Sequence, residues 1–197
     1  NRVLRQAGLL AVRDGPFGEM LIPGQSRAFA VADHQIAHVY LNDESAESAV
    51  RELLEATAGV DSVRHRKELQ LDHPRSGHLI ALADADAWFT YYYWNDERRA
   101  PDFARTVDIH RKPGYDPCEL FMTSKMRAGL RLLQKKIGMR YKMDVIPLDA
   151  SLVRGSHGLR PDPMDGPLLI GPSDRMTLPK EMTGFFDYMR AEFLSAS

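Results

Sequence analysis

The chain has 197 residues, of which 44% are hydrophobic and 27% are charged, a composition that is ordinary for a globular protein. Lys and Arg number 26 against 27 Asp and Glu, and the resulting net charge of -1 excludes the basic surface of a non-specific nucleic-acid binder. No apolar run approaches the roughly 20 residues that span a bilayer, and the single cysteine, Cys118, excludes a disulfide framework or a Cys-based zinc finger. We therefore expect a cytoplasmic protein whose partners include neither a nucleic-acid polymer nor a membrane.

The chain opens on the pattern of a short helix. Val3 and Leu4 lie among polar residues, and Gly8 takes the position in which a glycine commonly ends a helix. A domain seldom begins abruptly on such a helix. We therefore expect the chain to be the C-terminal part of a longer protein.

Residues 28–94 predict a small α+β unit with an antiparallel sheet. Runs of β-branched and aromatic residues, typical of strands, flank one segment whose apolar residues recur at helical spacing. In chain order the unit is β-α-β-β-β: a strand over 34–41, a helix over 46–57, and strands over 60–63, 79–83 and 88–94.

The sequence from residue 95 onward is less regular. Strands are indicated at 106–110 and 168–170, and the segment 111–117, rich in Pro and Gly, predicts a loop. A basic stretch from residue 125 predicts a helix that ends near Gly138. A second, amphipathic helix is predicted at the C-terminus, with one apolar face made of Met182, Phe185, Phe186, Met189 and Phe193.

The aromatic run 88–94 has two interpretations. It can form a wall on which a nucleobase stacks, or it can be a strand in the core of the sheet, with Trp88 and Tyr92 on one face and Tyr91 and Tyr93 on the other. We favour the core, because most aromatic runs of this kind are buried.

A histidine between small residues, in Arg154-Gly155-Ser156-His157-Gly158, is the most specific local signal. Glycine lets the backbone approach a ligand closely, and a neutral imidazole there can serve as a metal ligand or a general base. The alternative is a histidine that caps a turn.

Four stretches resemble the alkaline phosphatase superfamily, and most closely its type I phosphodiesterase/nucleotide pyrophosphatase family. They are the His157 loop ahead of residues 166–171, and the segments 28–35, 88–91 and 106–117. The resemblance implies an α/β fold: the C-terminal part of an alkaline phosphatase-like sandwich with an inserted small α+β cap containing an antiparallel sheet. In that layout residues 1–27 are the tail of the core domain, 28–105 the cap subdomain, and 106–197 the return to the core with the metal-ligand loop and the C-terminal helix.

The same resemblance implies a metal-dependent hydrolase of phosphodiester, pyrophosphate or phosphomonoester bonds in a small phosphorylated substrate such as a nucleotide. Two divalent cations would clamp the reacting phosphoryl group, and His157 would bind one of them. Histidine with carboxylates suits zinc best, with manganese or iron as alternatives. The hydroxyl nucleophile of the family has no match here and is expected upstream, so we expect this chain alone to be incomplete and inactive.

Weaker candidates for the site lie between residues 108 and 116. On a strand, Asp108 and His110 would share a face and could, with Asp116, contribute to a metal site, while Lys112 could bind a phosphate as a point charge. The alternative is that Asp108 and Asp116 accept hydrogen bonds from loop amides.

Asp33-His34-Gln35 is similar to the family's Asp-His-Gly motif, except that Gln35 replaces the glycine. We interpret this segment as the edge of the cap sheet and His34 as structural, with a ligand role as the alternative. A function from a different class also stays open. A non-catalytic α+β module could bind a ligand or a partner protein through its aromatic sheet and the basic helix 125–136.

Overall fold

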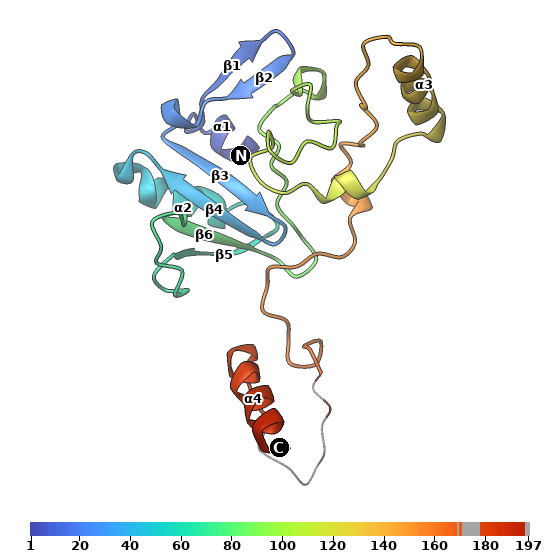
Figure 1. Cartoon of the computed structure of the whole chain (residues 1–197). Coiled ribbons are helices and arrows are strands. Elements are labelled where there is room, and N and C mark those ends of the chain that lie inside the picture. Colours follow the sequence, from blue (N-terminus) through green and yellow to red (C-terminus); the bar gives the residue numbers. More distant parts are fainter. Residues whose placement is uncertain (169, 171–177, 196–197) are drawn as a thin grey trace. The chain divides into compact units, whose positions relative to one another are not determined.

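A computed structural model describes residues 1–168, 170 and 178–195 of the chain (Figure 1). The chain divides into two compact units, residues 1–159 and residues 160–197. Among the described residues, no helix is both long enough and apolar enough to cross a membrane.

A four-stranded antiparallel sheet forms the centre of the first unit (Figure 1). Its strands lie in the order β3-β4-β6-β5, with bounds β3 Ala28–Asp33, β4 Ile36–Leu41, β6 Leu79–Ala83 and β5 Val60–His65. The helix α2, Glu47–Glu55, connects β4 to β5. The antiparallel sheet, the strands at 34–41, 60–63 and 79–83, and the helix between them are therefore confirmed.

The N-terminal segment is a short helix followed by a hairpin. The helix α1 spans Arg2–Gln6, and the strands β1, Val12–Gly15, and β2, Gly18–Leu21, pair in antiparallel fashion. Gly8 has a φ of +73°, and the amide of Leu9 donates a hydrogen bond of 2.9 Å to the carbonyl of Leu4. The helix therefore ends at the predicted glycine, because glycine adopts this left-handed conformation without a steric penalty.

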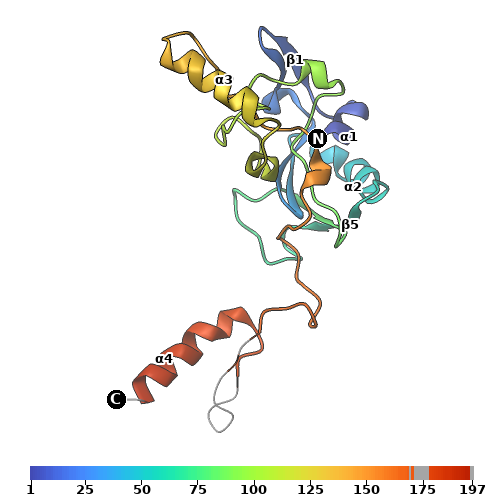
Figure 2. The ribbon, with the colours of Figure 1, turned by 90° about the vertical axis from the view of Figure 1, so that its right-hand side faces the viewer.

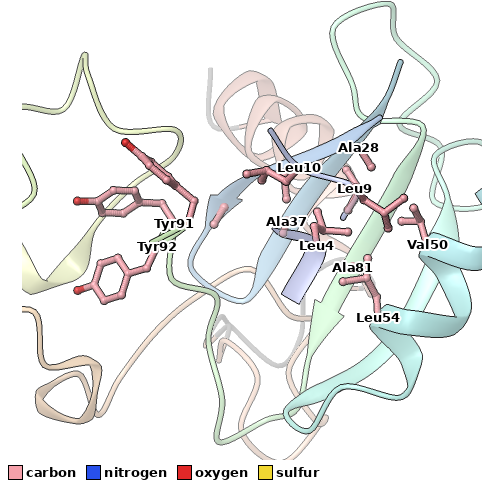
Figure 3. Close-up of a cluster of buried hydrophobic side chains, with 14 of the residues drawn as sticks. Leu4, Leu9, Leu10, Ala28, Ala37, Val50, Leu54, Ala81, Tyr91 and Tyr92 are labelled. Atoms are coloured by element: carbon pink, nitrogen blue, oxygen red, sulfur yellow. The ribbon is translucent and has the colours of Figure 1, made fainter. Parts of the chain in front are cut away.

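The core of the first unit lies between the sheet and the two N-terminal helices. Figure 3 shows Leu4, Val50 and Leu54 gathered beside Ala81 of the sheet. Alternate residues of β3 and β4 are buried, as expected for strands with one covered face. Many of these buried strand residues are alanine, whose small side chain lets a helix lie close to the sheet.

The prediction of a strand at 88–94 is wrong, although the prediction that this run belongs to the core is confirmed for Tyr91 through Trp94. All four side chains from Tyr91 to Trp94 are buried, but the backbone of this run forms no strand. The backbone is bonded by side chains instead of a neighbouring strand: Arg5 Nη1 donates to the carbonyl of Tyr93 (3.1 Å) and Arg2 Nε to that of Trp94 (2.7 Å). Because these carbonyls are satisfied by α1, no sheet partner is needed.

Residues 106–110 form turns rather than the predicted strand, and 111–117 is the predicted loop. The helix α3, Lys125–Lys136, is confirmed, with Gly138 at a φ of +76° just beyond its end. This helix stands apart from the sheet and buries none of its residues (Figure 2).

In the second unit, α4 spans Phe185–Ser195, which confirms the C-terminal helix. Met182 precedes it in a 3-10 turn, and the side chains of Met182 and Phe186 are largely exposed. The side chain of Phe193 lies outside the described residues. Leu168 and Ile170 are not in a strand, whereas Leu169, the centre of that predicted strand, also lies outside the described residues.

This mixed α/β architecture with two antiparallel sheets is compatible with the predicted fold class. The alkaline phosphatase-like sandwich stays a prediction. The division into residues 1–27, 28–105 and 106–197 also stays a prediction. In the structure, all residues from 1 to 159 belong to one compact unit.

Candidate metal centre

The His157 loop lies against the tip of the hairpin formed by β3 and β4. The backbone amide of Gln35 donates a hydrogen bond of 2.9 Å to the carbonyl of His157. Gly158 follows with a φ of +116°, and a Cβ at this position would lie 3.2 Å from the amide nitrogen of Ile36. Glycine at 158 therefore permits the close contact between the loop and the hairpin.

A tight turn at His34 and Gln35 forms the tip of this hairpin, between the paired residues Asp33 and Ile36. His34 has a φ of +56°, an uncommon conformation for a residue with a side chain. The side-chain amide of Gln35 donates to the carbonyls of Ala85 (3.1 Å) and Ala87 (3.2 Å). These bonds hold the tip of the hairpin to the segment that follows β6.

The turn and the loop together bring three potential metal ligands to one place. Asp33, His34 and His157 each offer a ligand atom, and these atoms lie within 4.8 Å of one another. The two imidazole rings have centroids 3.9 Å apart, inclined by 34°. His34 is buried, whereas Asp33 and His157 are exposed, so the cluster opens to solvent on one side.

The ring of His34 is held by two neighbours. Its Nδ1 lies 2.8 Å from the hydroxyl oxygen of Ser156, and the ring of Tyr115 stacks on it at a centroid distance of 4.9 Å. Burial lowers the pKa of His34, the proximity of His157 lowers it further, and the carboxylate of Asp33 opposes both effects. The net effect favours a neutral imidazole, which is the form that binds metals.

The donor set fits a divalent metal ion. One carboxylate and two imidazoles are three protein ligands of the kind found in catalytic zinc sites, which leave a fourth position for water or substrate. The same set also suits iron, in the arrangement of two histidines and one carboxylate.

Lys112 and Asp116, by contrast, are buried against each other. The ammonium of Lys112 lies 3.0 Å from a carboxylate oxygen of Asp116 and also contacts Glu119. Asp116 in addition accepts a hydrogen bond of 3.1 Å from the amide of Cys118. The bond from the Cys118 amide is a contact of the kind that the loop-amide alternative predicts for Asp116.

Asp108 and His110 lie in turns near the surface. Asp108 lies 3.8 Å from Arg111, and His110 is exposed. Within the described ranges, neither of them joins a group of three or more potential ligands, and nor does Asp116. Their roles in metal binding, and that of Lys112 toward phosphate, stay predictions.

The interpretation of His34 as structural does not anticipate its position beside His157. The signal was present in the likeness of Asp33-His34-Gln35 to Asp-His-Gly. It was outweighed by the strand pattern that follows, which assigns His34 to the strand, whereas the structure places it in the turn.

A family model described as type I phosphodiesterase / nucleotide pyrophosphatase matches residues 1–116. The matched region contains Asp33, His34 and Tyr115, and the His157 loop lies C-terminal to it. No curated protein matches the chain, and no solved structure does.

Proposed function

Because the chain belongs to the type I phosphodiesterase / nucleotide pyrophosphatase family, we propose that it is part of a metal-dependent hydrolase. The match over residues 1–116 supports a hydrolase in general. The finer proposal is that phosphodiester, pyrophosphate or phosphomonoester bonds of a small substrate such as a nucleotide are hydrolysed. The observation that supports the metal dependence is that His157 lies beside two further potential metal ligands, Asp33 and His34.

His157 is the residue that we propose as a metal ligand of this enzyme. Its ring is exposed, while its backbone is fixed to the hairpin by the bond from Gln35, so the imidazole is presented at a defined place. A bound divalent ion supplies positive charge to phosphoryl oxygens and lowers the pKa of a hydroxyl bound to it. Zinc is the ion we propose, with manganese or iron as alternatives.

We further propose that the nucleophile is contributed by residues outside this chain, because no segment here matches the family's nucleophile motif. The 197-residue chain alone would then be inactive. We also propose a cytoplasmic location, which the single, buried and unpaired Cys118 supports.

Two measurements test this function. The isolated chain is expected to show no turnover of bis-p-nitrophenyl phosphate with added Zn²⁺ or Mn²⁺. In the full-length protein, His157→Ala is expected to lower turnover by orders of magnitude, whereas His73→Ala, a change at an exposed turn, serves as the control. Metal-dependent turnover by the isolated chain, or wild-type turnover by His157→Ala, would contradict the proposal.

The alternative, a non-catalytic binding or interaction module, is favoured by one observation only. The helix α3 exposes more than half of the surface of Leu130, Leu133 and Ile137. The aromatic residues from Tyr91 to Trp94 do not support this alternative, because they are buried and cannot stack on a ligand. Absence of turnover in the full-length protein with any of the three metals would favour it.

A further inference from the structure

We propose that the helix α3 binds the surface of membranes that contain anionic lipids, through an apolar stripe flanked by lysines. The stripe consists of Met126, Leu130, Leu133 and Ile137. The inference does not rest on the proposed function. It revises the expectation that no membrane is a partner, because that expectation excluded only a spanning segment. A helix that lies in the plane of the interface needs no apolar run of that length.

The first argument is the exposure of the apolar stripe. At 3.6 residues per turn, its four residues fall within about 60° of one another around the helix axis. Each of them exposes more than half of its surface. Ala128 lies on the opposite side of the helix and packs against the buried cluster of Cys118, Val145 and Ile146. The stripe therefore faces solvent, on the side of α3 that points away from the body of the first unit.

The second argument is the segregation of charge. Residues 120–143 contain seven Lys or Arg and no Asp or Glu, so this segment carries a charge of +7 and the rest of the chain -8. Within the part of the chain that the structure describes, four of the seven have no ion-pair partner within 4.0 Å, namely Lys125, Lys135, Lys136 and Arg140. Free cations beside an apolar stripe complement a surface with anionic headgroups over an apolar interior.

The third argument is that the helix is already formed and is held to the protein. The hydroxyl oxygen of Ser124 caps its start by accepting a hydrogen bond of 3.4 Å from the amide of Arg127, and Gly138 follows its end with a φ of +76°. Arg131 Nε donates a hydrogen bond of 2.7 Å to the carboxylate of Asp144, which also pairs with Arg127. Because the helix need not fold on binding, little conformational entropy is lost when it meets a membrane.

The fourth argument favours a membrane over the groove of a partner protein. Protein interfaces generally depend on Trp, Tyr and Arg anchors seated in pockets. The stripe contains only Met, Leu and Ile, and both arginines of α3 are engaged by Asp144. Exposed apolar side chains also continue beyond both ends of the helix, at Leu120, Met122 and Met139. A fluid interface accommodates this irregular set, whereas a groove shaped for one helix would contact the stripe alone.

Co-sedimentation with vesicles tests the proposal, with the 197-residue chain and the full-length protein each measured. The probes are vesicles of phosphatidylcholine alone and vesicles of phosphatidylcholine and phosphatidylserine in equal parts. We expect both proteins to bind the anionic vesicles only. Both should be released at about 1 M salt, where the Debye length falls to about 3 Å.

Two double substitutions test the charge and the apolar stripe separately. Lys135→Gln with Lys136→Gln is expected to weaken binding about 30-fold, because each basic residue near an anionic surface contributes about 5-fold. Leu130→Gln with Leu133→Gln is expected to weaken it by at least about 10-fold, because less apolar surface then leaves water. Glutamine is the replacement in both because it keeps a high helix propensity.

Matched controls remove charge or apolar surface elsewhere on the first unit. Lys67→Gln with Arg75→Gln removes two exposed cations from the segment between β5 and β6. Phe17→Gln removes an exposed aromatic side chain between β1 and β2. We expect both controls to bind the anionic vesicles as wild type does.

Several results would overturn the proposal. Failure of the full-length protein to bind anionic vesicles would do so even where the 197-residue chain binds, because the rest of the protein would then cover the stripe. Wild-type binding by either double variant of α3, or equal weakening by the controls, would also overturn it. If vesicles are not bound but a synthetic acidic amphipathic peptide is, the stripe docks a protein and the assignment to a membrane is wrong.

Discussion

Gly158→Ala tests whether the His157 loop lies on the hairpin as described. Gly158 has a φ of +116°, and an added Cβ would lie 3.2 Å from the amide nitrogen of Ile36 and 3.4 Å from that of Gln35. A residue with a side chain in left-handed backbone costs roughly 1–2 kcal/mol, and the crowding of two backbone nitrogens adds to that cost. We therefore expect the docked loop to lose about 2 kcal/mol relative to the undocked one.

Hydrogen exchange at the amide of Gln35 measures this loss, because that amide donates to the carbonyl of His157. A change of about 2 kcal/mol corresponds to about a 30-fold change in an equilibrium constant, so the amide is expected to exchange about 30-fold faster when local opening limits exchange. The amides of buried residues such as Val39 in β4 should keep their rates.

Gly155→Ala is the matched control for this experiment. Gly155 lies in the same loop, but a Cβ there would meet no atom within 4 Å, and its φ is not positive. We expect wild-type exchange at Gln35 in this variant. An unchanged Gln35 rate in Gly158→Ala, or the same acceleration in both variants, would refute the docked arrangement.

The remaining predictions concern a buried ion pair and the thiol. Lys112→Met leaves the carboxylates of Asp116 and Glu119 without their cation, so we expect the free energy of unfolding, measured in urea, to fall by about 3–5 kcal/mol. Unchanged stability together with weakened phosphate binding would instead favour a substrate role for Lys112. Burial raises the pKa of Cys118 to about 11, so iodoacetamide at pH 8 should alkylate the native chain far more slowly than the urea-unfolded chain. Rapid alkylation of the native chain would contradict the burial of this thiol. Because the unfolded thiol loses its proton at a lower pH than the folded thiol, the contribution of Cys118 to stability should decline as the pH rises from about 9 toward 11.

Elements with local signals could be predicted from the sequence. The helix α2 and the strands β5 and β6 carry their periodicity within a few residues, and Gly8 and Gly138 mark helix ends by a conformation that glycine adopts most readily. The formation of these elements depends mainly on residues nearby in the chain, so it can be predicted without knowing which other segments pack against them.

The aromatic run 88–94 shows where local pattern fails. Its composition is that of a strand, but a strand also needs a partner, and the partner is decided by distant residues. Here the side chains of Arg2 and Arg5 in α1 donate hydrogen bonds to the carbonyls of Trp94 and Tyr93, which in a sheet would accept hydrogen bonds from a neighbouring strand. The sequence therefore indicated that these residues are buried but not how their backbone is satisfied.

The candidate metal centre is the clearest case of what only the tertiary structure decided. The sequence by itself determined the types of donor, since His157 lies between small residues and Asp33 precedes His34. Whether these donors share one site depends on the turn at His34 and on the close approach that Gly158 permits. Contacts between residues so far apart in the chain are set by the folding of the whole unit, because no local pattern encodes which distant segment a loop will meet.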